Sequence, residues 1–257
     1  MYKIVFLDID GTLVNREKVV SDTTKQAIKK LKQNGLQVVL ATGRPPYHFG
    51  YIAEELDISS FVAFNGAYVC HDGELVHATP LDRDALGKLV KLAKENGHPL
   101  IFSNHEKAVS NELDHPEVLE SYHSLKLDYR PECQPDFWRE TDLYQAMLYC
   151  KAHEERAYQQ EIPEFSFVRW HPLSMDVMPA RGSKATGIQA MLDHLGLSPN
   201  EAVAFGDGLN DREMLTYVGM GVAMGNAHEE IKPYAKMVTK TNDEDGVVYA
   251  LSGLGLI

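Results

Sequence analysis

Four short polar clusters hold the residues whose types and spacing suit catalysis. They are Asp8–Leu13, Ala41–Arg44, Gly182–Lys184 and Gly206–Asp211. One cluster alone says little, because a pair such as Asp-Gly commonly forms a turn. Three of the four, however, directly follow apolar runs that are typical of buried strands. Parallel α/β sheets build their sites outside the carboxyl ends of the strands, so we expect the four clusters to meet at one site.

The carboxylates in these clusters point to a metal ion. Asp8 and Asp10 lie two residues apart after the first apolar run, and Asp207 and Asp211 follow a later one. Several carboxylates in one cleft repel one another unless a cation compensates their charge. Ligand sets made of oxygen alone favour magnesium. We therefore expect a Mg²⁺ ion at this site.

The same residue types suit phosphoryl transfer. A carboxylate at a strand tip can attack phosphorus and form an aspartyl phosphate. A second carboxyl two residues later, Asp10, can protonate the leaving oxygen and afterwards accept a proton from water. The Thr42 hydroxyl, the Gly43 amide and the Lys184 ammonium are suitable donors to phosphate oxygens.

Alternating strands and helices must position these clusters. The expected helices are Ser21–Asn34, Pro45–Leu56, Ser183–Leu195, Asp211–Val218, Ala227–Ala235 and Asp245–Leu251. The expected strands are Lys3–Leu7, Leu36–Leu40, Phe61–Phe64, Ala202–Phe205, Met220–Met224 and Met237–Val238, with a hairpin around Asp72-Gly73. Repeated strand–helix–strand units predict a Rossmann-like α/β fold with a parallel sheet covered on both faces.

The order of elements becomes less regular in the middle of the chain. Leu81–Asn96 is predicted to be helical and Arg130–Asp136 a loop, and the strands expected here are Pro99–Ser103, Gln145–Cys150 and Phe165–Trp170. The segment Leu173–Met178 ends this region. We infer a discontinuous α/β core, residues 1–80 plus 181–257, that carries an inserted α+β cap domain, residues 81–180. Both connections leave the catalytic edge of the core, which suits a lid that sets substrate specificity.

Composition argues against several classes of partner. The net charge is −12, whereas nucleic acids and anionic membranes attract basic surfaces, so neither is expected as a partner. The N-terminal apolar run is too short for a signal peptide, and no stretch is long enough to span a bilayer. The three cysteines lack C-x-x-C spacing, which argues against a disulfide framework and a thiolate zinc site. The expected location is cytoplasmic.

The four clusters resemble the four motifs of the haloacid dehalogenase-like (HAD) superfamily. The long insertion resembles the large α/β (type IIB) cap of its Cof-type phosphatases, and the resemblance covers nearly the whole chain, including Gly221–Ala227 and Asp243–Val247. It implies a magnesium-dependent phosphomonoester hydrolase that acts on small phosphorylated metabolites, such as sugar phosphates, through an aspartyl phosphate.

The resemblance also implies a role for each matching residue. Asp8 resembles the nucleophile, with its second oxygen on Mg²⁺, and Asp10 resembles the acid/base, with its main-chain carbonyl on the metal. Asp207 resembles the remaining protein ligand of the metal, and Asp211 an acid that orients Lys184 or a metal-bound water. The implied phosphate contacts are Thr42, Gly43, Lys184 and Asn210, and the candidates for contact with the leaving group are Arg44 and Asn65.

Other interpretations stay open at this stage. The acids can be turn or helix-cap residues, Lys184 a solvated lysine, and Arg44 half of a surface salt bridge. Phosphomutases share the Asp-x-Asp opening, and a regulator that binds phosphorylated metabolites can keep the fold without the activity. Dehalogenation fits less well, because a halide leaving group needs no protonating acid such as Asp10. The insertion has no pattern that identifies the leaving group.

Overall fold

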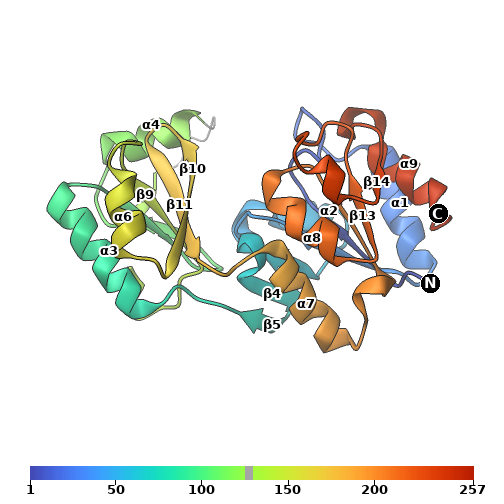
Figure 1. The fold of residues 1–257 in the computed structure, drawn as a ribbon, viewed down its shortest axis with the longest axis horizontal. Helices are drawn as coiled ribbons and strands as arrows, with labels where there is room; N and C mark the ends of the chain where they lie inside the picture. The colour runs from blue at the N-terminus through green and yellow to red at the C-terminus, as the bar shows by residue number, and fades with distance from the viewer. Residues whose placement is uncertain (125–129) are drawn as a thin grey trace. The chain divides into compact units, whose positions relative to one another are not determined.

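The computed structural model describes residues 1–124 and 130–257 and divides the chain into two compact units. The core unit comprises residues 1–78 and 183–257, and the insert unit comprises residues 79–182 (Figure 1). The boundaries expected from the sequence, after residues 80 and 180, each lie two residues inside the insert unit.

The core unit is built on an eight-stranded sheet in the order β14-β13-β12-β1-β2-β3-β4-β5. Its strands are β1 (Ile4–Leu7), β2 (Gln37–Ala41), β3 (Phe61–Ala63), β4 (Tyr68–His71), β5 (Glu74–Ala78), β12 (Ala202–Gly206), β13 (Met220–Ala223) and β14 (Met237–Val238). Pairing is parallel from β14 to β3 and antiparallel for β4 and β5, which form the hairpin predicted at Asp72-Gly73. The sheet is therefore parallel where the polar clusters lie.

Strand β1 lies between β12 and β2, and this neighbourhood brings three clusters together. All four residues of β1 are buried, which explains its continuous apolar sequence. Leu7, its last residue, pairs with Phe205 on β12 and with Leu40 on β2. Because the three strands are parallel and in register, the clusters that follow them begin at the same edge of the sheet.

The core unit has five α-helices in the described part of the chain. They are α1 (Asp22–Gln33), α2 (Gly50–Glu55), α7 (Lys184–Leu195), α8 (Arg212–Tyr217) and α9 (Gly246–Gly253). Helix α1 lies against α9, and α7 packs on α8 and on β3 to β5 (Figure 1). The side chains of Ser21 and Ser183 cap α1 and α7 by accepting hydrogen bonds from the backbone amides of Thr24 and Thr186.

Two helices expected from the sequence are not formed as predicted. The segment Pro45–Leu56 divides into a 3₁₀ turn at Pro46–His48 and helix α2, because Phe49 takes a non-helical φ of −129° between them. The segment Ala227–Ala235 forms turns and a short 3₁₀ helix at Lys232–Tyr234 instead of an α-helix. Pro233 lies inside that segment, and its ring and missing N–H disfavour a helix interior.

The insert unit is a six-stranded sheet with helices, in the order β10-β11-β9-β6-β7-β8. Its elements are α3 (Arg83–Asn96), β6 (Leu100–Ser103), β7 (Ala108–Ser110), α4 (Pro116–Ser124), β8 (Glu132–Cys133), α5 (Phe137–Glu140), β9 (Gln145–Tyr149), α6 (Glu155–Glu161), β10 (Phe165–His171) and β11 (Ser174–Pro179). Strand β8 lies within Arg130–Asp136, which was predicted to be a loop. Leu86 and Leu89 of α3 join Phe102 of β6 and Leu148 of β9 in the hydrophobic core of this unit.

The expected fold class, a Rossmann-like parallel-sheet core with an inserted α+β domain, is confirmed. Within residues 1–124 and 130–257, no helix has both the length and the apolar character needed to cross a membrane.

Candidate active site

Asp8 and Asp207 follow the neighbouring strands β1 and β12, and Gly11 lies against the Asp207 carboxylate. The Asp8 amide donates to the Phe205 carbonyl at 3.1 Å, which extends the β1–β12 ladder into the first cluster. Gly11 has a φ of +77°, and a Cβ at this position would collide with the Asp207 carboxylate. Glycine is therefore required here, both for the backbone conformation and for the close approach of Asp207.

Lys184 joins the first and last clusters. Its Nζ donates to Asp8 Oδ1 at 2.5 Å and to Asp211 Oδ1 at 2.6 Å, and its side chain is 1% exposed. Burial lowers the pKa of Lys184, but the charges of Asp211 and Asp8 outweigh burial and hold the pKa above its ordinary value. The lysine is therefore a buried, charged group between two carboxylates, which excludes the interpretation of a solvated lysine.

Asp8, Asp207 and Asp211 form a group that can hold a metal ion, with one oxygen of each within 4.8 Å of the others. Burial raises the pKa of Asp8 well above its ordinary value, and the charges of Asp211 and Asp207 add to this effect while Lys184 opposes it. Burial likewise raises the pKa of Asp207 to about 6. Such carboxylates become more stable in ionised form next to a cation, so the group fits an oxygen-ligated divalent ion.

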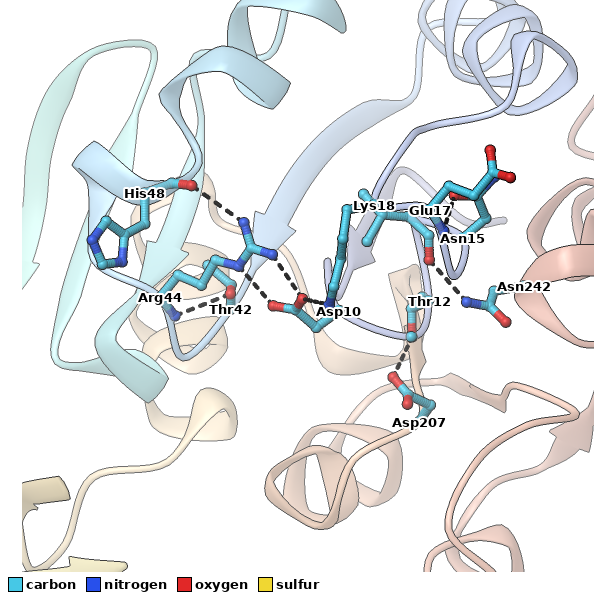
Figure 2. Close-up of polar contacts among 12 residues, drawn as sticks. Asp10, Thr12, Asn15, Glu17, Lys18, Thr42, Arg44, His48, Asp207 and Asn242 are labelled. Atoms are coloured by element: carbon cyan, nitrogen blue, oxygen red, sulfur yellow. Dashed lines mark hydrogen bonds and ion pairs between the residues drawn. The ribbon is translucent and has the colours of Figure 1, made fainter. Parts of the chain in front are cut away.

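The Asp10 carboxylate lies outside that group and is held by two cations (Figure 2). Arg44 donates from Nε to Oδ2 and from Nη2 to Oδ1, both at 2.7 Å, and Lys18 Nζ donates to Oδ1 at 2.8 Å. Burial raises the pKa of Asp10, but the hydrogen bonds and charges of Arg44 and Lys18 outweigh burial and lower it to about 2. Arg44 thus contacts the expected acid/base directly.

Three of the expected phosphate contacts, Thr42, Gly43 and Asn210, are linked through Asn65. Asn210 Nδ2 donates to Asn65 Oδ1 at 2.8 Å, and a Cβ on Gly43 would lie 3.0 Å from the Asn65 side-chain amide. The Asn65 backbone is left-handed, with a φ of 52°, and its amide donates to the Thr42 carbonyl at 3.1 Å. Asn65 therefore connects the second cluster with the fourth.

Two residues in these contacts received no role from the sequence. Thr12 lies in the first cluster, and its Oγ1 donates to Asp207 Oδ1 at 3.0 Å (Figure 2). Lys18 lies in the loop after the first cluster and donates to Asp10. Asn15 indicates a turn in this loop, but no sequence motif connects Lys18 with Asp10. The site thus extends beyond the four motifs.

A model of the haloacid dehalogenase-like hydrolases matches residues 5–251. The chain belongs to this family. A Bacillus subtilis (strain 168) relative, named "Putative phosphatase YkrA", is 43% identical over 255 residues, which cover 99% of this chain and 98% of that protein.

Solved structures agree with the family assignment. The crystal structure of a hypothetical protein from Geobacillus kaustophilus HTA426 matches with a TM-score of 0.97 at 48% identity, over 100% of both chains. The HAD subclass IIB sugar phosphatase BT4131 has a TM-score of 0.84 at 29% identity, over 99% of this chain and 100% of that chain. The predictions of a Cof-type HAD protein and of a phosphatase-type enzyme are confirmed.

Proposed function

We propose that this HAD enzyme is a magnesium-dependent phosphomonoester hydrolase that acts on small phosphorylated metabolites through an aspartyl phosphate on Asp8. The observation that carries the proposal is the position of Asp8, buried at the end of β1 between Lys184 and the carboxylates of Asp207 and Asp211. The similarity to the sugar phosphatase BT4131 supports sugar phosphates or similar compounds as substrates.

The proposed reaction has two steps. First, Asp10, which Arg44 and Lys18 keep ionised in the free protein, takes up a proton from solvent in the substrate complex. A carboxylate oxygen of Asp8 then attacks phosphorus, the ester P–O bond breaks, and the leaving oxygen takes that proton. Second, Asp10 takes a proton from a water whose oxygen attacks phosphorus, and the bond between phosphorus and Asp8 breaks. Inorganic phosphate leaves, Asp10 returns its proton to solvent, and both carboxyl groups are back in their starting protonation states.

The proposed cofactor is Mg²⁺, which would polarise the phosphoryl oxygens and neutralise the acidic group when bound. Asp8 and Asp207 would contribute carboxylate oxygens. Asp10 would contribute its main-chain carbonyl, since its carboxylate is engaged by Arg44 and Lys18. Asp211 is the third member of the acidic group, but it accepts from Lys184 Nζ and from two backbone amides, which suits a supporting role.

The remaining residues are proposed to orient the phosphoryl group. Lys184 offers positive charge beside Asp8 in a buried environment, where a charge–charge interaction is stronger than in water. Thr42, Gly43 and Asn210 offer a hydroxyl, a main-chain amide and a side-chain amide as donors. Asn65 holds Asn210 at 2.8 Å and so acts on that group indirectly.

The insert unit is proposed to act as a cap that contacts the leaving group and selects the substrate. The chemistry proposed for the core residues is the same for every phosphate ester, so selection needs contacts from elsewhere. The net charge of −12 agrees with a small-molecule substrate and gives no support to nucleic-acid or anionic-membrane partners.

The test is phosphate release from p-nitrophenyl phosphate by the metal-free protein, with and without added Mg²⁺. We expect release only with Mg²⁺, and the assay also separates the alternatives. Binding of phosphorylated sugars without any release indicates a regulator, and transfer of the phosphoryl group to a second sugar hydroxyl in preference to water indicates a mutase. Either outcome would contradict a hydrolase.

A further inference from the structure

Lys18 belongs to none of the four polar clusters, yet its ammonium reaches the proposed acid/base. Its Nζ lies 2.8 Å from Asp10 Oδ1, and Arg44 holds both oxygens of the same carboxylate from another side (Figure 2). Among the residues that the structure describes, Asp10 is the one side chain that donates or accepts a hydrogen bond with the Lys18 ammonium. Lys18 and Arg44 together restrict how Asp10 can turn.

The loop before Lys18 is ordered by its own hydrogen bonds. Asn15 Oδ1 accepts from the amides of Glu17 and Val19, both at 3.0 Å, and the Lys18 amide donates to the Asn15 carbonyl at 2.9 Å. Asn242 Nδ2 also anchors the loop by donating to the Val14 carbonyl at 2.9 Å. These contacts reverse the chain and bring Lys18 back towards Asp10.

Stability alone does not account for a lysine at this position. The Lys18 side chain is 63% exposed and the Asp10 side chain 43% exposed, and ion pairs this open contribute little to folding. The Lys18 backbone has a φ of 64°, in the left-handed region where glycine is favoured over residues with a Cβ. A strained backbone that presents a cation to a reactive carboxyl indicates a functional constraint.

We propose that Lys18 is a positioning residue that, together with Arg44, sets the orientation in which Asp10 transfers its proton to the leaving oxygen. This inference rests on the proposed function, in which the proton moves from the Asp10 carboxyl to the ester oxygen as its bond to phosphorus breaks. Lys18 itself gives up no proton and forms no bond in either step. Its loss should therefore affect most strongly the substrates whose leaving oxygen requires protonation.

The test compares two substrates across matched variants. p-Nitrophenolate leaves readily without a proton, whereas a sugar alkoxide needs one, so the panel is p-nitrophenyl phosphate and the best sugar phosphate from a screen. The variants are Lys18→Met, Lys18→Gly and Lys18→Arg, and Lys29→Met on the exposed surface of α1 is the control. Lys18→Gly suits the left-handed backbone, so relief of the strain at φ 64° offsets the entropy that glycine adds to the unfolded chain.

We expect kcat for the sugar phosphate to fall about tenfold in Lys18→Met and Lys18→Gly, and kcat for p-nitrophenyl phosphate to change less than about twofold. Lys18→Arg should recover most of the loss, Lys29→Met should match the wild type, and the Tm of Lys18→Gly should equal or exceed the wild-type value.

Three outcomes would overturn the inference: equal losses on both substrates, no loss on either, or a change confined to KM. Failure of the proposed function gives a different result, because the wild type would then release no phosphate from either substrate with Mg²⁺.

Discussion

Lys184 shows how strongly the individual residues of the site depend on one another. It is buried, and it is tolerated because two carboxylates accept hydrogen bonds from its ammonium. Removing one carboxylate leaves the lysine with the other partner, whereas removing the lysine leaves two buried acids facing each other. Substitutions at Asp8 are therefore better suited to test chemistry without unfolding the protein.

Replacing the proposed nucleophile, Asp8→Asn, should lower kcat by a factor of about 10³ or more, because the amide cannot attack phosphorus. The fold should persist, since Asp211 still accepts from Lys184. The measurements are p-nitrophenyl phosphate turnover and a thermal melt, with Asp84→Asn on helix α3 as the control. Turnover near that of the wild type in a verified Asp8→Asn protein would exclude Asp8 as the nucleophile.

Metal dependence is the second prediction at the scale of residues. Mg²⁺ should restore activity to the metal-free protein, and Ca²⁺ should compete poorly or inhibit, because Ca²⁺ prefers a larger and looser oxygen shell. Activity is measured during titration with each ion after dialysis against chelator. Full activity in excess chelator, with metal removal confirmed by elemental analysis, would contradict a magnesium enzyme.

At the scale of elements, helix α7 places Lys184 by packing closely against the segment after β3. The closest approach is made by two glycines, since a Cβ on Gly187 would lie 2.5 Å from Val62 Cγ1 and 2.8 Å from Gly66 Cα. Gly66 itself has a φ of +99° and approaches the Ser183 carbonyl. The position of the first turn of α7, and hence of Lys184, depends on this contact.

Gly187→Ala should therefore push α7 outwards and destabilise the protein by about 1–3 kcal/mol, as overpacking of a core commonly does. It should also lower kcat, because Lys184 moves with the helix. Gly253→Ala at the end of α9 is the matched control, where the nearest atom outside the helix is Met237 Cε at 3.9 Å. Urea unfolding and turnover are measured on both. Wild-type stability and activity in Gly187→Ala would show that the contact does not position α7.

Much of this arrangement could be predicted from the sequence. The apolar runs that became β1, β2 and β12 end directly at their polar clusters, so the strands and the edge that their clusters share were predictable. The break after His48, the turns at Ala227–Ala235 and the short elements α4, α5, α6 and β7 were not. Short segments contain too few repeats of the apolar pattern to show whether they form a helix or a strand. Tertiary contacts determine which structure they adopt.

The candidate site shows the same limit. Asp8, Asp207 and Lys184 were identified from residue type and position. The direction in which a side chain points could not be predicted from the sequence. In the structure the acidic group contains Asp211, whereas the Asp10 carboxylate contacts Arg44. Lys18 could not be found at all, because its contact with Asp10 depends on a reversal of the loop between them.

At the scale of the whole molecule, the two units suggest a division of labour. The core unit contains every residue proposed for the chemistry, and the insert unit has its own sheet and hydrophobic core. A separate core lets the insert unit vary without disturbing the proposed catalytic residues.

Exchanging residues 79–182 for the corresponding unit of a relative should change which phosphate ester is preferred. Phosphorylation of the enzyme by acetyl phosphate should change much less, because that small donor makes few contacts beyond the phosphoryl group. Kinetics of the chimera across a substrate panel measure both effects. If a folded, docked chimera kept the specificity of the original core, the insert unit would not be the specificity domain.

The central claim, an aspartyl phosphate on Asp8, is tested most directly by trapping. In Asp10→Asn with p-nitrophenyl phosphate, formation of the intermediate needs no acid while its hydrolysis lacks a base, so the phosphoenzyme should accumulate. After quenching, borohydride reduction and proteolysis, mass spectrometry should find homoserine at position 8, only when substrate and Mg²⁺ were both present. Phosphate release with residue 8 unmodified, or reduction at another carboxylate, would contradict the account.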